Sequence, residues 1–391
     1  MNVMPVGLYG ETEFWLSSGK VLLVFILFGF TFFSMVGVNP SRDAYGFRYW
    51  NDRGSFAEWH SQGNLGRFEG LLNVIWAGTF IVVGPEYLSM AAAETKLPRT
   101  YVKTAYKTVY FRFGLFFIGS AIAAGIVVPY DDPTLQALAA GEESSTSAAS
   151  SPYVIAMRQF GISVLPDLVN ALIFTSILSA GNTYTFCAMR SLYSMSLEGR
   201  APRVLSKCTR SGIPIYCLAV TCLISCLAFL QESSGSLVVL QWFVNLVTAG
   251  CTINFLVICI TYVRFYRACM VQGVDRTSFP YYGYFQPYAA WAGLCWTVFV
   301  ILGYGYSSFT PWDVGTFFSY YTMAIVAVAM YTAWKLATRS TIVGPESVDL
   351  MWERPVIDAY EASCTEVPVG FWTEIVQMVG LRRRHALDIN A

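Results

Sequence analysis

Residues 70–94 read GLLNVIWAGTFIVVGPEYLSMAAAE, an apolar stretch that is long enough to cross a bilayer and contains Gly84, Pro85 and Glu86 near its middle. A proline inside a helix costs about 3 kcal/mol or more, because it removes a hydrogen bond and clashes with the preceding turn. An acidic side chain at mid-membrane costs roughly 2.5 to 3.5 kcal/mol on insertion scales. Irregular backbone at this depth is tolerated where it is buried in protein or lines a water-filled cavity. The stretch therefore predicts a broken helix at a solute site.

The composition is that of a membrane protein with several spans. Of the 391 residues, 55% are hydrophobic and 13% are charged, whereas about 25% of the residues in soluble domains are charged. The mean hydropathy of +0.48 agrees with this class. The net charge is zero, which gives no indication of nucleic-acid binding. We expect an all-α bundle of membrane helices rather than several soluble domains.

Apolar runs predict eight membrane spans, because each has about the 17 to 25 residues that a spanning helix needs. They cover residues 21–37, 70–94, 109–129, 165–189, 214–230, 237–263, 288–306 and 315–337. Residues 1–19 contain Glu11 and Glu13 and precede the first run. They lack the basic leader and cleavage site of a signal peptide, so we expect the first run to be a true span.

The chain is predicted to consist of a membrane domain, residues 1–337, and a cytoplasmic C-terminal tail, residues 338–391. The charged composition of the tail favours a loosely folded or disordered segment. The alternative is a surface-binding amphipathic helix near residues 371–381.

Orientation is predicted from basic residues in the connections after the second, fourth and sixth spans. These residues are Lys96, Arg99, Lys103, Lys107, Arg200, Arg203, Lys207, Arg210, Arg264, Arg267 and Arg276. Short cytoplasmic loops carry an excess of Lys and Arg. Both termini are therefore expected to be cytoplasmic.

Gly84, Pro85 and Glu86 also have the pattern of a helix start. In this pattern Gly84 caps the helix, Pro85 takes the first helical position and Glu86 lies in the first turn, where the positive end of the helix dipole favours an acid. Two interpretations remain open. Either Glu86 carries a proton or faces a substrate ammonium group, or the stretch is a proline kink in which Glu86 binds a neighbouring helix.

The fourth span contains Ser179, Asn182 and Thr183, which are spaced for one polar face of a helix. Lining of a solute pathway and hydrogen bonding between helices explain this face equally well. In the sixth span, Asn245, Thr248 and Thr252 form a similar stripe. Helix packing is the favoured interpretation there.

The sequence shows no metal-binding or catalytic pattern. The ten cysteines are scattered without paired spacing, and we interpret them as small apolar packing residues. A P-loop, paired zinc ligands and a nucleophile elbow are all absent from the sequence. We therefore predict no enzyme activity, no metal and no cofactor.

Several stretches together resemble fungal amino acid permeases, in the amino acid, polyamine and organocation transporter superfamily. They are FEG (68–70), GPEYLSMAAAETKLPRT (84–100), YKTVYFRFGLFFIG (106–119), SPYVIAM (151–157), SAGNTYTFCAMRSLYSMSLEGRAPRVL (179–205), ITYVRFYRACMVQGVD (260–275) and YFQPYAAWAGLCW (284–296). The chain departs from the family pattern at Pro85, where a threonine is usual, and at Val82, where an aromatic residue is usual.

The resemblance implies a transporter fold of two inverted five-helix repeats plus two further helices. This chain corresponds to helices 5–12 of that fold, and the first four helices have no counterpart in it. The implied function is proton-coupled amino acid uptake by alternating access, in the plasma membrane. The implied partners are an amino acid, a proton and the lipid bilayer.

The resemblance also assigns roles to the residues already singled out. Val82, Val83, Gly84, Pro85 and Glu86 form the core of the expected substrate site, with Glu86 as the proton-linked residue. Ser179, Asn182 and Thr183 are further lining residues. The alternative is a truncated permease that does not transport and acts at most as a membrane scaffold or partner.

Overall fold

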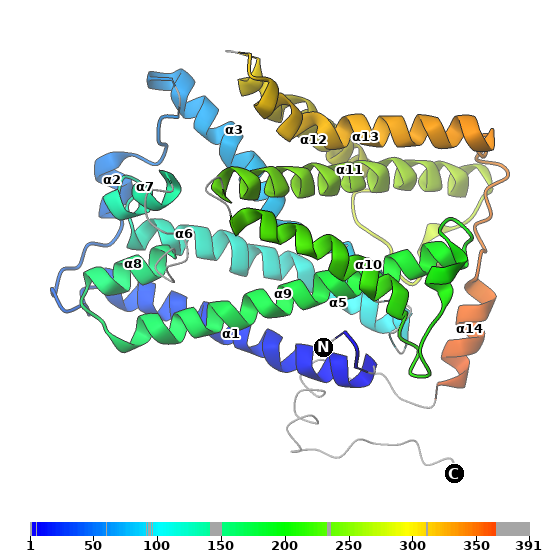
Figure 1. Ribbon diagram of the computed structural model, residues 1–391, viewed down its shortest axis with the longest axis horizontal. Helices are drawn as coiled ribbons and strands as arrows, with labels where there is room; N and C mark the ends of the chain where they lie inside the picture. The colour runs from blue at the N-terminus through cyan, green and yellow to red at the C-terminus, as the bar shows by residue number, and fades with distance from the viewer. Residues whose placement is uncertain are drawn as a thin grey trace, which may run out of the picture. The chain divides into compact units, whose positions relative to one another are not determined.

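The computed structural model describes residues 2–4, 6–59, 61–90, 92, 95, 97–140, 151–232, 236–309 and 312–364, and Figure 1 shows its helices. Within these residues the chain is helical, with one isolated β-bridge between Phe309 and Trp312 and no named strand. The all-α fold class is confirmed. Lys96 and the amphipathic segment expected at residues 371–381 lie outside the described residues.

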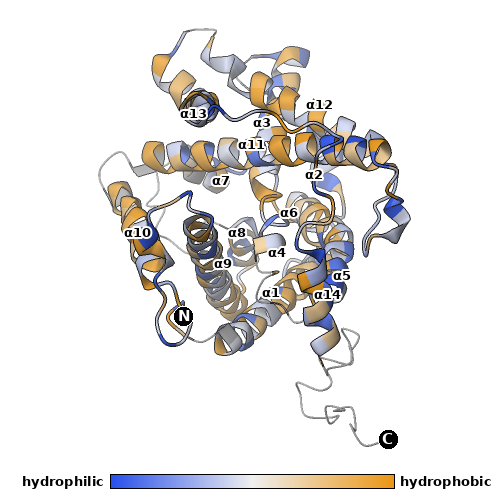
Figure 2. Cartoon of the chain, turned by 90° about the vertical axis from the view of Figure 1, so that its right-hand side faces the viewer, coloured by the Kyte–Doolittle hydropathy of each residue, from blue (hydrophilic) through white to orange (hydrophobic). Residues whose placement is uncertain are grey.

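Six described helices are long and apolar enough to span a membrane. They are Gly7–Met35, Pro98–Val127, Val164–Leu197, Val238–Val271, Tyr288–Ser308 and Val314–Thr338. A polytopic helix bundle is thus confirmed, but the count of eight spans is not. The other two predicted spans correspond to an interrupted helix around residue 84 and to the shorter apolar helix Ile215–Leu230. In Figure 2 hydrophobic residues prevail along the helices.

The first helix corrects a boundary expected from the sequence. α1 (Val6–Met35) begins well before the apolar run at residue 21, so residues 6–19 belong to the span and do not precede it. Its polar residues Glu13, Ser17 and Lys20 are spaced i, i+4 and i+7, which places them on one helix face. Glu13 and Lys20 both contact Ser179 of α9 (Val164–Leu197).

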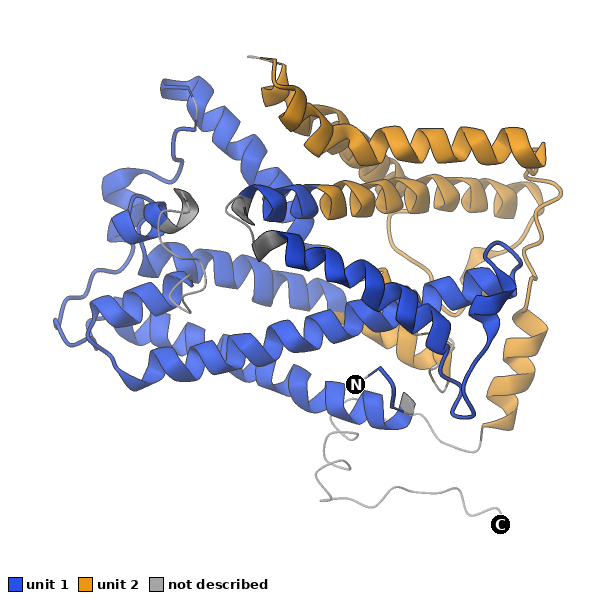
Figure 3. Ribbon diagram, in the orientation of Figure 1, with its two compact units in different colours: residues 1–82, 109–245 blue, residues 83–108, 246–391 orange. Residues whose placement is uncertain are grey.

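The described chain divides into two compact units, coloured separately in Figure 3. The first comprises residues 1–82 and 109–245. Its core lies where α1 meets α6 (Gly119–Val127), α8 (Pro152–Gln159) and α9. The core side chains are Leu23, Leu27, Phe30, Ala123, Val127, Val128, Tyr153, Val154, Ala156, Met157 and Val169.

The described part of the first unit has seven further elements. They are α2 (Arg48–Arg53), α3 (Gly63–Ile81), a π-helical turn (Phe113–Ile118), α7 (Pro133–Ala140), a 3₁₀ turn (Arg203–Ser206), α10 (Ile215–Ser225) and a further 3₁₀ segment (Cys226–Glu232). The π-helical turn joins α5 (Pro98–Arg112) to α6, so these two helices form one continuous candidate span.

The second unit comprises residues 83–108 and 246–391. Its elements are α4 (Tyr87–Met90), α5 (Pro98–Arg112), most of α11 (Ser236–Val271), the 3₁₀ turns Arg276–Ser278 and Tyr304–Ser308, α12 (Tyr288–Gly303), α13 (Val314–Thr338) and α14 (Arg354–Ser363). Tyr321 of α13 donates its hydroxyl to the carbonyl oxygen of Leu302 at 2.8 Å, which joins α12 to α13. The domain boundary at residue 337 stays a prediction.

Candidate functional site

The break expected in the opening stretch is present. α3 ends at Ile81, and the backbone N–H of Val82 still donates to the carbonyl oxygen of Gly78 at 3.1 Å. The chain then leaves the helix and resumes helical structure at Tyr87. Gly84 has a φ of +138°, a conformation that residues with a side chain rarely adopt. A Cβ at Gly84 would meet nothing within 4 Å, so glycine is required here for its backbone conformation and not for space.

Glu86 is the buried residue of this segment, with 8% of its surface exposed. Its Oε2 accepts a hydrogen bond from the backbone N–H of Gly84 at 3.2 Å. Its other oxygen, Oε1, is buried and has no hydrogen-bond partner among the described residues. A buried polar atom without a partner is costly, so Oε1 is a hydrogen-bond acceptor that the described residues leave open.

Two further helices of the second unit bring side chains near Glu86. Ser89 donates its hydroxyl to the carbonyl oxygen of Glu86 at 2.6 Å and lies close to Tyr106 of α5. Tyr87, the next residue along the chain, lies close to Cys251 of α11. The Tyr106 hydroxyl and the Cys251 thiol are therefore the polar groups that α5 and α11 contribute to the neighbourhood of Glu86.

The other predicted core residues differ from Glu86 in exposure. Val82 is exposed, whereas Val83, Gly84 and Pro85 are half-buried. Val82 belongs to the first unit and residues 83–86 to the second, so the boundary between the units passes through the break. Glu86 is thus the chemically distinctive member of the predicted core.

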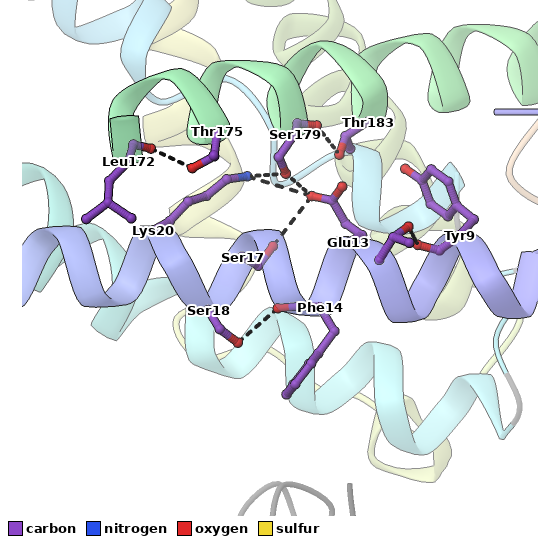
Figure 4. Close-up of polar contacts among 11 residues, drawn as sticks. Tyr9, Glu13, Phe14, Ser17, Ser18, Lys20, Leu172, Thr175, Ser179 and Thr183 are labelled. Carbon is purple, nitrogen blue, oxygen red and sulfur yellow. Dashed lines mark hydrogen bonds and ion pairs between the residues drawn. The ribbon is translucent and has the colours of Figure 1, made fainter. Parts of the chain in front are cut away.

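A second polar group lies between α1 and α9 in the first unit, as Figure 4 shows. We call it the α1–α9 polar cluster, and it consists of Tyr9, Glu13, Ser17, Lys20, Ser179 and Thr183. Lys20 Nζ donates to Ser179 Oγ at 2.7 Å and lies 3.7 Å from Glu13 Oε1. Ser179 donates its hydroxyl to the same Glu13 oxygen, and Ser17 does so at 3.5 Å.

Two of the three predicted lining residues of the fourth span belong to this cluster. Ser179 is fully buried, and Thr183 donates its hydroxyl to the Ser179 carbonyl oxygen at 3.0 Å and lies close to Tyr9. Asn182 instead accepts hydrogen bonds from Asn2 Nδ2 at its side-chain oxygen, 3.0 Å, and at its carbonyl oxygen, 3.1 Å. Ser179 and Thr183 therefore come together, and Asn182 has a separate partner.

The sequence interpretation missed Glu13 and Lys20 as members of a polar site. It placed Glu13 among residues 1–19, ahead of the first apolar run, and gave Lys20 no role. The available signal was the i, i+4, i+7 spacing of Glu13, Ser17 and Lys20, which puts a carboxylate, a hydroxyl and an ammonium group on one face of a helix.

The polar stripe of α11 is buried. Asn245, Thr248 and Thr252 have 1%, 0% and 1% of their surface exposed. Thr252 donates its hydroxyl to the Thr248 carbonyl oxygen at 2.7 Å, and Gln241 Nε2 donates to Asn245 Oδ1 at 3.0 Å. The expectation that this stripe faces protein is confirmed. In the described part of the chain, moreover, no group of three or more His, Cys, Asp or Glu side chains is arranged to hold a metal ion.

The protein is an integral, multi-pass helical membrane protein with an interrupted apolar helix and a buried carboxylate. The profile of the amino acid permease family matches residues 1–343. The chain belongs to this family, and the resemblance seen in the sequence is confirmed.

Most of the chain is similar in sequence to fungal permeases. The general amino acid permease AGP2 of Saccharomyces cerevisiae is 39% identical over 371 residues, which cover 92% of this chain and 62% of that protein. The proline-specific permease of the same yeast is 36% identical, covering 87% of this chain and 54% of that protein. The dicarboxylic amino acid permease is 32% identical, covering 92% and 60%. These relatives are transporters and not enzymes.

The chain spans about three fifths of the length of these relatives. No solved structure matches it.

Proposed function

We propose that the protein is an amino acid permease that takes up amino acids by proton-coupled alternating access. The observation that carries this proposal is Glu86, a buried carboxylate with a hydrogen-bond acceptor left open beside a helix break. Every amino acid substrate carries an α-ammonium group, which complements such an acceptor. The names of the yeast relatives cover general, proline-specific and dicarboxylic permeases, so amino acids are the substrate class they share.

In this proposal residues 82–86 form the core of the substrate site. Val82, Val83, Gly84 and Pro85 supply non-helical backbone, as in transporters whose substrates bind where helices are interrupted. Glu86 supplies the charge. Ser179, Asn182 and Thr183 are further lining residues, and they belong to the first unit.

Glu86 is also the proposed proton-linked residue. A buried carboxylate without a cationic partner is stabilised when it is neutralised, either by a proton or by a bound ammonium group. Proton and substrate then satisfy the same carboxylate at different stages of the cycle. This arrangement couples their movements.

We place the protein in the plasma membrane with both termini in the cytoplasm. The pattern of basic residues supports this orientation. The second unit adds support, because the tail contacts Arg99 at the start of α5 and Gln272 just after α11. Both residues lie in connections that the basic pattern assigns to the cytoplasmic side.

Uptake of labelled proline, glutamate, lysine and a mixture of neutral amino acids by a permease-deficient yeast strain tests the proposal. We expect the wild-type chain to transport at least one of them and Glu86→Gln to lose proton-driven uptake. Glu58→Gln is the matched control, because Glu58 is exposed and lies 3.8 Å from Arg67, far from the break in sequence. We expect it to transport like the wild type.

Full proton-driven uptake by Glu86→Gln would overturn the proton-linked role. Absence of uptake by a wild-type chain that is verified at the cell surface would overturn the permease function. It would favour the alternative, a membrane scaffold or partner that does not transport.

A further inference from the structure

Residues 344–363, which we call the tail strap, connect the end of α11 to the start of α5 within the second unit. At one end, the Gln272 side chain donates its Nε2 to the carbonyl oxygens of Pro345 at 2.9 Å and Val348 at 2.8 Å. Asp349 then accepts two backbone N–H groups of the following turn, each at 2.9 Å. The strap therefore has a fixed local shape before it reaches α5. This differs from the loosely folded tail expected from the sequence.

At its other end the strap binds Arg99, the second residue of α5. The Arg99 guanidinium pairs with Asp358, lies 3.8 Å from Glu361 Oε2 and donates to the Arg354 carbonyl oxygen at 3.4 Å. These three acceptors are spaced i, i+4 and i+7 on α14, so they share one face of that helix. In Figure 2 hydrophilic residues gather where α5 and α14 are labelled.

Glu361 also caps α5 from the tail. The first backbone N–H groups of a helix have no partner inside it, and Arg99 carries the first N–H of α5 because Pro98 has none. This N–H donates to Glu361 Oε1 at 3.0 Å. The carboxylate thus satisfies an unpaired donor and places negative charge at the positive end of the helix dipole.

The contact at Arg99 is more than a surface ion pair. An isolated exposed pair contributes little to stability. Here the Arg99 and Glu361 side chains are only 27% and 20% exposed, and one arginine makes charged and backbone contacts in a fixed geometry. Such charge-assisted, multiply bonded contacts are the stronger kind.

A continuous series of contacts leads from the strap to the break, and all of it lies in the second unit. The strap holds Arg99 at the start of α5. Further along the same helix, Tyr106 lies close to Ser89. The Ser89 hydroxyl in turn donates to the carbonyl oxygen of Glu86 at 2.6 Å. A displacement of the start of α5 is therefore transmitted to the residue that carries the site.

From this series we infer that the tail strap regulates the Gly84–Glu86 site, with Arg99 as the positioning residue through which the tail acts. The effect on uptake rests on the proposed permease function, whereas the effect on the break does not. In alternating access, helices around the site move relative to one another. A strap that fixes the start of α5 slows this movement, so its release raises the maximal uptake rate and leaves the KM for the amino acid close to its original value.

Hydrogen–deuterium exchange on the full chain in lipid nanodiscs tests the inference without transport. We compare the wild type with Asp358→Asn/Glu361→Gln and with the control Glu346→Gln, whose side chain is exposed and whose contact with Gln272 is through its carbonyl oxygen. In the double variant we expect roughly fivefold faster exchange in peptides covering residues 84–90 and 98–106, as loss of an ordinary hydrogen-bonded contact produces. Glu346→Gln is expected to exchange like the wild type.

An increase confined to residues 354–363 would overturn the inference, because the strap would then loosen without affecting the break. A charge exchange tests the pairing itself: Arg99→Asp should loosen the same peptides, and Arg99→Asp with Asp358→Arg should restore their protection. If Asp358→Arg alone loosens the strap but the double variant Arg99→Asp/Asp358→Arg does not regain protection from deuterium exchange, the inference is also overturned.

Uptake by the double variant is the functional measurement. A raised maximal rate at similar KM supports regulation by the strap, and an unchanged rate in a chain with a loosened break overturns it. A wild-type chain without any uptake refutes the proposed permease function, and the exchange data then decide the positioning role by themselves.

Discussion

Glu13 and Glu86 are both carboxylates in apolar stretches of the chain, Glu13 within α1 and Glu86 in the break before α4, and their surroundings differ. Glu13 has Lys20 at 3.7 Å and accepts hydroxyl hydrogen bonds from Ser17 and Ser179. Glu86 accepts one backbone N–H, and among the described residues no cation pairs with it. The α1–α9 polar cluster therefore supplies its own counter-charge, whereas the described residues supply none at the break.

The difference between the two carboxylates is whether a cationic side chain lies beside them, and this determines what stabilises each one. A pair of opposite charges is stabilised only as a pair, since loss of either partner leaves the other charge uncompensated. A lone carboxylate is stabilised by whatever neutralises it. We therefore expect the Glu13–Lys20 pair to matter chiefly for stability and the break chiefly for uptake.

The largest expected effect on stability comes from breaking the pair. Lys20→Met leaves Glu13 without its cation, and we expect a loss of roughly 1 to 3 kcal/mol, below the cost for a fully buried pair because both side chains are partly exposed. Thermal unfolding of the purified protein in nanodiscs measures it. Lys20→Met/Glu13→Gln should recover part of the loss, because the uncompensated charge is removed.

Glu86→Gln is the comparison for this prediction, since it removes an acid for which the described residues supply no cation. We expect its unfolding temperature to equal or exceed that of the wild type while uptake is lost. Equal destabilisation by Lys20→Met and Glu86→Gln would contradict the distinction between the two carboxylates.

The next effect concerns the backbone at the break. Gly84→Ala forces a side chain onto a residue with a φ of +138°, which costs of the order of 1 to 3 kcal/mol in strained conformations. Gly78→Ala is the matched control, because a Cβ at either glycine meets nothing within 4 Å and Gly78 is helical. Alanine there should stabilise α3 by up to about 1 kcal/mol. Thermal unfolding of both variants checks the contrast, and equal effects would show that Gly84 is not required for its conformation.

The smallest effect is a pH dependence in the first unit. Burial raises the pKa of Tyr153 to about 12, and its hydroxyl donates to the Ser120 carbonyl oxygen at 3.0 Å. Because the pKa of Tyr153 in the folded state lies above the ordinary value of 10, the contribution of its neutral hydroxyl to stability is complete below pH 10 and is lost as the pH rises toward 12. Between pH 9 and pH 12, the free energy of unfolding should fall more steeply with rising pH for the wild type than for Tyr153→Phe. Parallel curves would show that Tyr153 does not titrate with folding.

Particular residues show how far sequence reasoning reached. The cost of a proline and an acid in an apolar run predicted the break at Gly84, because these penalties depend on residue type and on local backbone geometry. Periodicity predicted the buried stripe of Asn245, Thr248 and Thr252 for the same reason. By contrast, Glu13 was counted among residues 1–19 ahead of the first span and Lys20 was given no role, since the hydroxyl that contacts both of them, Ser179, lies on a helix distant in the sequence.

The sequence by itself determined the all-α membrane class, the family and the position of the break, since each depends on composition, on local patterns or on the cost of placing a given residue in lipid. Only the tertiary structure decided that Ser179 of α9 donates to Glu13, that one oxygen of Glu86 stays open among the described residues, and that the tail caps α5 at Arg99. The physical reason is that satisfaction of a buried charge depends on groups brought near it by folding. Sequence spacing measures that proximity only within a single helix.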